Sequence, residues 1–114
     1  MKFTADIIEI NLELTGLPDE EGKKETKIFI PRERPSVDFA ESVIKKGNEY
    51  VEEQKKLEVK EQDKIFLANM KFLGWVYKDF DYNWVRKNFT PGQVANIRED
   101  VANGLMGIKK EEQS

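Results

Sequence analysis

The sequence predicts an α+β fold in which an N-terminal antiparallel β-hairpin or small sheet is followed by about three α-helices. Three observations support this fold class. Residues 3–14 and 26–30 alternate between apolar and polar side chains, as half-buried strands do. From residue 37 onward, apolar residues recur instead at helical spacing. Residues 90–93, with the sequence TPGQ, have the composition of a helix N-terminus.

The first strand is expected to bury one aliphatic face. Residues 16–24 (GLPDEEGKK) then predict a charged turn, because Pro18 and Gly22 interrupt the alternation. An isolated hairpin is marginal in water, so we expect a covering helix, a third strand from residues 1–7, or the edge of a neighbouring subunit. The residues that share the aliphatic face are Ile8, Ile10, Leu12 and Leu14.

The second strand, residues 26–30, has apolar side chains on both faces. Ile28 and Ile30 point one way, and Lys27 and Phe29 point the other. Because an unpaired strand edge can pair with another chain, we expect Ile28, Phe29 and Ile30 to take part in self-association.

Two prolines, at positions 31 and 35, end the second strand and lead into the first helix. Ser36 is the expected N-cap, and the helix should end near Lys56, with a break near Leu57. Gly47 is unfavourable in a helix interior, so it indicates either a bend or the close approach of another backbone. The apolar stripe of this helix consists of Val37, Ala40, Val43, Ile44 and Val51.

A second helix is expected over residues 59–78. Its two apolar stripes form an arc too wide for a helix that is covered from one side only. Residues 79–87 interrupt the pattern, and Thr90 should cap a last helix that Gly104 or Gly107 can end.

Composition excludes several function classes. The 114 residues predict one α+β domain over residues 1–108, with a disordered polar tail over residues 109–114. The 19 basic and 22 acidic residues are mixed along the chain, which argues against a nucleic-acid partner. No apolar run approaches the roughly 20 residues that span a membrane, so we expect no membrane partner and a cytoplasmic location.

Residues suited to catalysis are scarce. The chain has no Cys and no His, which removes thiol chemistry and the commonest acid–base group. Asp79 and Asp81 flank Phe80, but the segment lacks the further oxygen donors of a calcium loop. We therefore expect a non-enzymatic protein without metal or cofactor.

The aromatic residues allow two interpretations. Trp75, Trp84 and Phe89 either form a core between the last helices or remain available to a partner. The last helix has the same two possibilities, since Val94, Ile97, Val101 and Leu105 share one face that can pack in its own domain or in a partner's groove.

The C-terminal part of the chain carries a family resemblance. An aromatic helix is followed by Asn88-Phe89-Thr90 and then by a short helix ending in Gly104-Leu105-Met106-Gly107. This arrangement resembles the tail assembly chaperones of long-tailed (siphovirus-type) bacteriophages and prophages of Gram-positive bacteria. The N-terminal strand-turn-strand and the charged central helices agree with that family in size and order.

The resemblance implies a function without catalysis. Similar proteins bind the long, hydrophobic tape measure protein, keep it soluble during tail morphogenesis, and are displaced as tail tube protein polymerises. They commonly self-associate, so the resemblance implies a homo-oligomer in the host cytoplasm, with tape measure protein and possibly tail tube protein as partners. The expected client or self-contact surface consists of Trp75, Trp84, Phe89, Val94, Ile97 and Val101. A minor virion or head–tail connector component, and a small regulator that binds a folded partner, are the alternatives.

Overall fold

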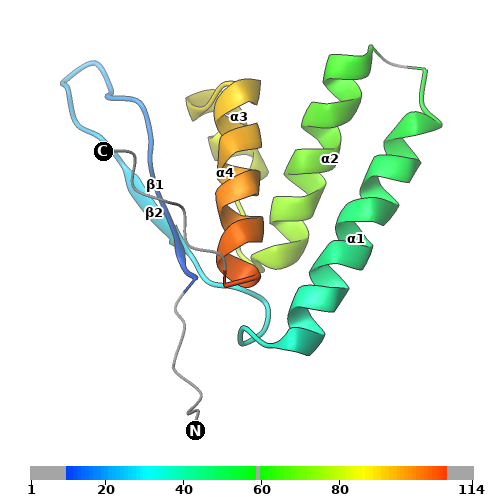
Figure 1. The fold of residues 1–114 in the computed structure, drawn as a ribbon. Helices are drawn as coiled ribbons and strands as arrows, with labels where there is room; N and C mark the ends of the chain where they lie inside the picture. The colour runs from blue at the N-terminus through cyan, green and yellow to red at the C-terminus, as the bar shows by residue number, and fades with distance from the viewer. Residues whose placement is uncertain (1–9, 59, 108–114) are drawn as a thin grey trace, which may run out of the picture.

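The computed structural model describes residues 10–58 and 60–107, and within them a β-hairpin precedes four helices (Figure 1). The α+β class is therefore confirmed. Both the third strand expected in residues 1–7 and the tail expected in residues 109–114 lie outside the described residues. The elements are β1 (Leu12–Thr15), β2 (Thr26–Phe29), α1 (Val37–Lys55), α2 (Glu61–Val76), α3 (Tyr82–Asn88) and α4 (Pro91–Leu105).

The register of the hairpin decides which face of β2 is buried. Leu12 pairs with Phe29 and Leu14 pairs with Lys27, and paired residues of antiparallel strands share a face. Because Leu14 enters the core, Phe29 does so as well and is only 3% exposed. Ile28, which is 60% exposed, lies on the outer face. Phe29 is thus a core residue, which corrects its expected place on a self-association surface.

The turn between the strands is held by its own side chains. Asp19 Oδ1 accepts hydrogen bonds from the backbone N–H groups of Glu21 and Lys23, both at 2.9 Å. Gly22 adopts a φ of 82°, which a residue with a side chain rarely does. The charged loop expected between the strands is therefore an ordered turn.

The first helix begins where the sequence predicts. Ser36 Oγ accepts a hydrogen bond from the N–H of Phe39 at 3.0 Å, which confirms the N-cap. The helix continues through Gly47 to Lys55. A Cβ placed on Gly47 would lie 3.4 Å from the ring of Phe72, which is ordinary contact with a side chain, so no backbone approaches closely enough here to require glycine.

The second helix lies between α1 and α4 in the helical layer (Figure 1). Ala68, Met70, Phe72, Leu73 and Val76 are all buried, which confirms that its apolar arc is covered from more than one side. A single open face would have left part of that arc in water.

A fourth helix, α3, occupies the segment expected to be irregular. Asp81 caps it, since Asp81 Oδ1 accepts a hydrogen bond from the N–H of Trp84 at 3.1 Å. Helices this short are not stable alone, and Val85, which is fully buried, supplies the tertiary anchor. The expectation of about three helices missed α3 because one buried residue leaves no periodic pattern.

The last helix has the expected capping box. Thr90 Oγ1 accepts from the N–H of Gln93, and Gln93 Oε1 accepts from the N–H of Thr90. Gly107, with a φ of 72°, follows the C-cap Met106, so Gly107 rather than Gly104 ends the helix.

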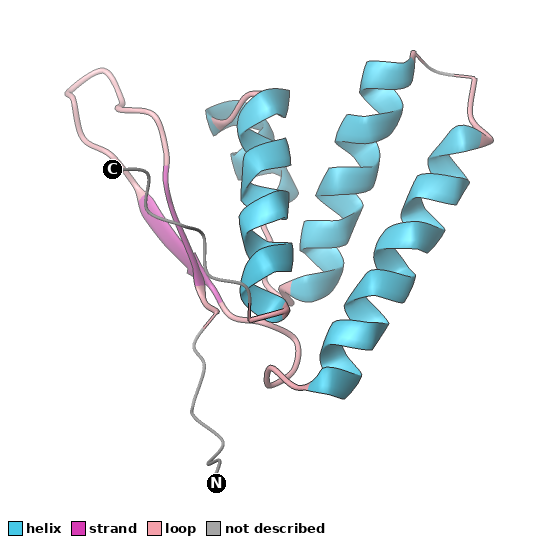
Figure 2. Cartoon of the chain, in the orientation of Figure 1, coloured by secondary structure: helices cyan, strands magenta, loops and turns pink. Residues whose placement is uncertain are grey.

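The hairpin lies on one side of the helical layer, away from α1 (Figure 2). Among the described residues, one hydrophobic cluster joins the hairpin to all four helices. A buried segment after α2 completes this connection, because Tyr77 forms a bridge with Pro31 and its hydroxyl donates to the carbonyl of Ile10 at 2.9 Å. Burial raises the pKa of the Tyr77 hydroxyl far above its ordinary value, so the group stays protonated and able to donate.

Candidate protein-binding surface

An apolar stripe along α1 faces away from the core. Val37, Ile44 and Val51 are spaced by seven residues, or about two helical turns, and therefore line up along the helix. They are 75%, 49% and 39% exposed. The opposite side of the same helix carries the buried Phe39. Both sides of α1 are thus apolar, and only one of them is covered.

The exposed stripe borders a groove between α1 and α4. Three adjoining hollows of about 440, 110 and 400 Å³ follow one another along the groove and share lining residues. Ile65 of α2, which is 55% exposed, extends the apolar lining at one end. We call this surface the α1–α4 groove and define its apolar part by Val37, Ala40, Ile44, Val51, Ile65 and Met106.

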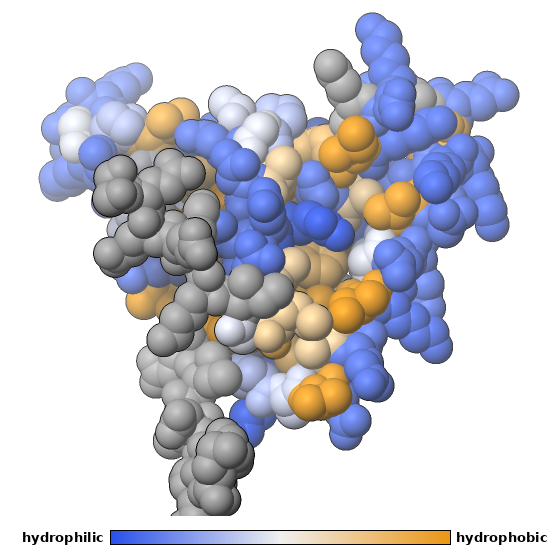
Figure 3. Space-filling view, viewed as in Figure 1, coloured by the Kyte–Doolittle hydropathy of each residue, from blue (hydrophilic) through white to orange (hydrophobic). Residues whose placement is uncertain are grey.

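The space-filling view shows hydrophobic side chains along the face over α1 and α4, beside hydrophilic side chains on the outer side of α1 (Figure 3). Apolar surface that is contiguous and rimmed by polar groups is typical of binding sites. An extended groove next to a helix suits a second helix better than it suits a small ligand.

One end of the groove is polar. Gln54 of α1 and Asn69 of α2 line it and are buried, and Arg98 reaches it from α4. The guanidinium of Arg98 lies 5.0 Å from the centre of the Phe72 ring. A Cβ on Gly47 would lie 3.7 Å from Arg98 Nη2, so the guanidinium also lies beside Gly47 of α1.

The expected partner-binding residues do not form one exposed surface. Val94 and Val101 are buried in the core, and Ile97 is half-buried against it. Of the two possibilities for α4, packing within its own domain is therefore confirmed for this face. The side of α4 that borders the groove presents Arg98, Ala102 and Leu105, and the C-cap Met106 follows them.

Trp84 and Phe89 attach the hairpin to α3. Their rings meet edge-on with centres 5.9 Å apart, and Trp84 also contacts the ring of Phe29. Both residues are half-buried. The aromatic residues in this region therefore pack within the domain, but Trp84 does so between α3 and the hairpin rather than between the last helices.

Trp75 lies elsewhere, between α2 and the segment that follows β2. Its ring stacks on Phe39 with centres 5.8 Å apart, and the guanidinium of Arg32 lies 4.9 Å from its centre. Arg32 also donates from Nε to the Trp75 carbonyl. Trp75 therefore fixes the entry into α1 and is separate from Trp84 and Phe89.

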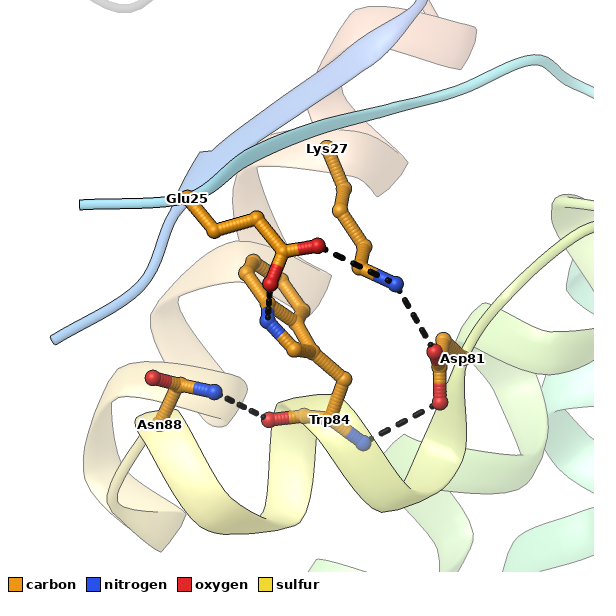
Figure 4. Close-up of polar contacts among 5 residues, drawn as sticks. All are labelled: Glu25, Lys27, Asp81, Trp84 and Asn88. Carbon is orange, nitrogen blue, oxygen red and sulfur yellow. Dashed lines mark hydrogen bonds and ion pairs between the residues drawn. The ribbon is translucent and has the colours of Figure 1, made fainter. Parts of the chain in front are cut away.

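Polar contacts between the hairpin and α3 surround Trp84 (Figure 4). Lys27 Nζ donates to Asp81 Oδ2 at 3.0 Å, and Trp84 Nε1 donates to Glu25 Oε2 at 3.2 Å. Asn88 Oδ1 accepts from the N–H of Leu17 at 2.8 Å. A Cβ on Gly16 would crowd Asn88, so the absence of a side chain there permits this contact.

The charges of this network alter the pKa values of both partners. The N–H of Trp84, and then the ammonium of Lys27, hold the pKa of Asp81 below its ordinary value. The hydrogen bond to Asp81 raises the pKa of Lys27. Each charged form is therefore stabilised by the fold.

We expect the stability of the hairpin contact to depend on pH through Asp81. Because its pKa is lower in the folded chain, its contribution is complete above the ordinary carboxyl pKa and is lost as pH falls through the folded value. The urea midpoints of wild type and Asp81→Asn should therefore differ at about pH 7 and converge toward about pH 2. The exposed Asp79→Asn is the control, and an equal pH dependence of the two variants would contradict the assignment.

The sequence predicts the exposed groove residues as an apolar stripe of the first helix. It does not predict that they are exposed to solvent. The spacing of seven between Val37, Ile44 and Val51 is the signal that marks them, because Phe39 already supplies a separate core-facing side. Ile28 and Ile30 are exposed on the outer side of the hairpin, as a self-association surface requires.

Within residues 10–58 and 60–107, no cluster of three or more acidic, His or Cys side chains could hold a metal ion. None of the helices there has the length and apolar character needed to cross a membrane. Comparisons with family models, with curated proteins and with solved structures found no significant match.

Proposed function

We propose that this protein is a non-enzymatic tail assembly chaperone of a long-tailed phage or prophage, which acts in the host cytoplasm. Its client is the tape measure protein, and an apolar helical segment of that client lies in the α1–α4 groove. The observation that carries the proposal is the row of exposed apolar residues Val37, Ile44 and Val51 beside an open groove. The resemblance described above supplies the identity of the client.

The geometry supports a helical client on physical grounds. Residues 37 and 51 are separated by 14 positions, which corresponds to about 21 Å along a helix. A client helix of similar length could bury its apolar face against this row, as amphipathic helices do in hydrophobic grooves. Shielding that face would keep a long apolar protein in solution until the tail tube protein replaces the chaperone.

Self-association is assigned to a different surface. Ile28 and Ile30 are exposed on the outer face of the hairpin, whereas the groove is lined by residues of the helices α1, α2 and α4. We propose that the homo-oligomer forms through these two isoleucines. The client surface and the oligomer surface can then be tested separately.

The test is co-expression with the tape measure protein of the same tail gene cluster, followed by purification of the soluble complex. Wild type should carry the client into the soluble fraction. Ile44→Asp should reduce the recovered client at least about tenfold, because a carboxylate would have to be desolvated inside the groove. Ile44 is half exposed, so the circular dichroism spectrum of the variant should be unchanged.

The matched control is Ile28→Asp, which places the same charge at a similarly exposed isoleucine outside the groove. It should retain the client and lower the molar mass measured by light scattering. Loss of the client with Ile28→Asp but not with Ile44→Asp would move the client site to the hairpin. If folded wild type solubilises no client, the chaperone function is refuted, and presence in purified particles would instead identify a virion component.

A further inference from the structure

The polar end of the α1–α4 groove contains a buried side chain without hydrogen-bond partners. Gln54 is 1% exposed, and neither Nε2 nor Oε1 is bonded within the described part of the structure. Buried carboxamides are nearly always paired, since an unpaired donor or acceptor loses its hydration without replacement. Gln54 also lines the hollow of about 400 Å³ at this end. A ligand group that reached the Gln54 carboxamide from this hollow would be offered both a donor and an acceptor.

The same hollow has an excess of positive charge. Arg98, Lys55 and Lys64 line it, together with one carboxylate, Glu61. Lys55 is paired with Glu52 at 3.1 Å, so Arg98 and Lys64 supply the excess over Glu61. The guanidinium of Arg98 lies over the Phe72 ring, 5.0 Å from the ring centre, where it lines this end of the groove. Arginine presents a planar fork of donors that matches a carboxylate, and it retains its charge at every physiological pH.

We propose that this end of the groove binds a glutamate or aspartate side chain of the client helix. Arg98 and the Gln54 amide donate to the carboxylate, while neighbouring apolar residues of the client pack on Val51 and Ile65. The inference rests on the proposed function and defines its client further. The occupant is an amphipathic helix with one acidic residue within its apolar face.

The acidic residue would determine how the client lies. An apolar face repeated along a helix packs almost equally well in several registers and in both directions. Arg98 lies at one end of the groove only. In any other register or direction, the carboxylate of the client would be buried without a partner, which is unfavourable. The polar end therefore selects both the segment of the client and its direction.

The experiment uses fluorescently labelled peptides of about 25 residues that tile the same tape measure protein, long enough to form a helix across the groove. For each peptide that binds, the acidic residue within the apolar face is changed to Gln and to Lys. Kd values are measured by fluorescence anisotropy at fixed salt concentration. Co-purification of the full-length client is measured in parallel for every variant.

Arg98→Glu should weaken binding of the original peptide roughly thirtyfold or more, as expected when one partner of a buried charge pair is reversed. The Glu→Lys or Asp→Lys peptide should restore binding to that variant. Gln54→Met should weaken binding while leaving the urea midpoint equal or higher, because it removes an unpaired buried amide. The matched control is Arg86→Glu, since Arg86 makes the same kind of contact with the Phe66 ring outside the groove.

The outcomes separate this inference from the proposed function. If the client co-purifies and its affinity is unchanged by Arg98→Glu and by removal of the acidic side chain, the inference is wrong and the function stands. If Arg98→Glu alters the oligomer mass and leaves peptide binding unchanged, a second copy occupies the groove and the inference is wrong. If wild type neither co-purifies the client nor binds any peptide, both proposals fail.

Discussion

Val94→Asp is expected to abolish folding. Val94 is fully buried in the first turns of α4, within the cluster that joins this helix to the rest of the core. The substitution removes a buried aliphatic side chain and desolvates a carboxylate, which together cost about 5 kcal/mol or more. Domains of this size are stable by about 5–15 kcal/mol, so the loss approaches or exceeds the whole stability.

The measurement is near-ultraviolet circular dichroism together with urea unfolding. The control is Val37→Asp, which introduces the same change at a residue that is 75% exposed, and it should keep the native spectrum. Val37→Asp should nevertheless reduce client recovery, because Val37 lines the groove. If Val94→Asp instead gave a native spectrum and cooperative unfolding, Val94 would not be a core residue. Its face of α4 would then again be a candidate for the client surface.

Phe39→Ala is expected to cause the second-largest loss. The ring is completely buried between α1 and α2 and stacks on Trp75. Removing a buried phenylalanine side chain usually costs about 3–5 kcal/mol, because the transfer energy is lost and a cavity remains. The free energy of unfolding, measured by urea titration with circular dichroism at the helical wavelength, should fall by about this amount.

Val37→Ala, two residues earlier in the same helix, is the matched control for Phe39→Ala. Its side chain is exposed, so the change should stay within about 0.5 kcal/mol of wild type. A loss below about 1 kcal/mol for Phe39→Ala would mean that the α1–α2 contact is not formed as described.

These two predictions bear on where a client can bind. The residues first expected to bind it are mostly the ones that hold the domain together, because Val94 and Val101 are core residues and Trp84 joins the hairpin to α3. A charge at such a position would remove client binding by unfolding the protein. Exposed groove residues such as Ile44 avoid that ambiguity.

Local signals in the sequence predicted the starts of two helices. Ser36 and Thr90 can satisfy free N–H groups with their own side chains, and Gln93 completes the capping box. Such contacts form within three residues, so they depend little on the rest of the chain. The break between the first two helices near Leu57 could also be predicted, because the charged stretch around it has few apolar residues.

The hairpin could be predicted from the sequence only in part. Alternation identified two strands but could not say which face of β2 turns inward, since Phe29 on one side and Ile28 with Ile30 on the other are all apolar. Pairing with β1 decided it by placing Phe29 on the face of Leu12. Register is a relation between two segments, and one strand alone does not contain it.

By itself, the sequence determined the fold class, the capped helix starts and the apolar stripe of α1, because each follows from residues close together in the chain. Only the tertiary structure decided that α3 forms, that Val94 and Val101 are core, and that Val37, Ile44 and Val51 border an open groove. It also brought Gln54 and Arg98 to one end of that groove. The physical reason is that the burial of a residue depends on which elements pack together. The hydrophobic effect is non-directional, so it favours many packing arrangements and does not by itself select one of them.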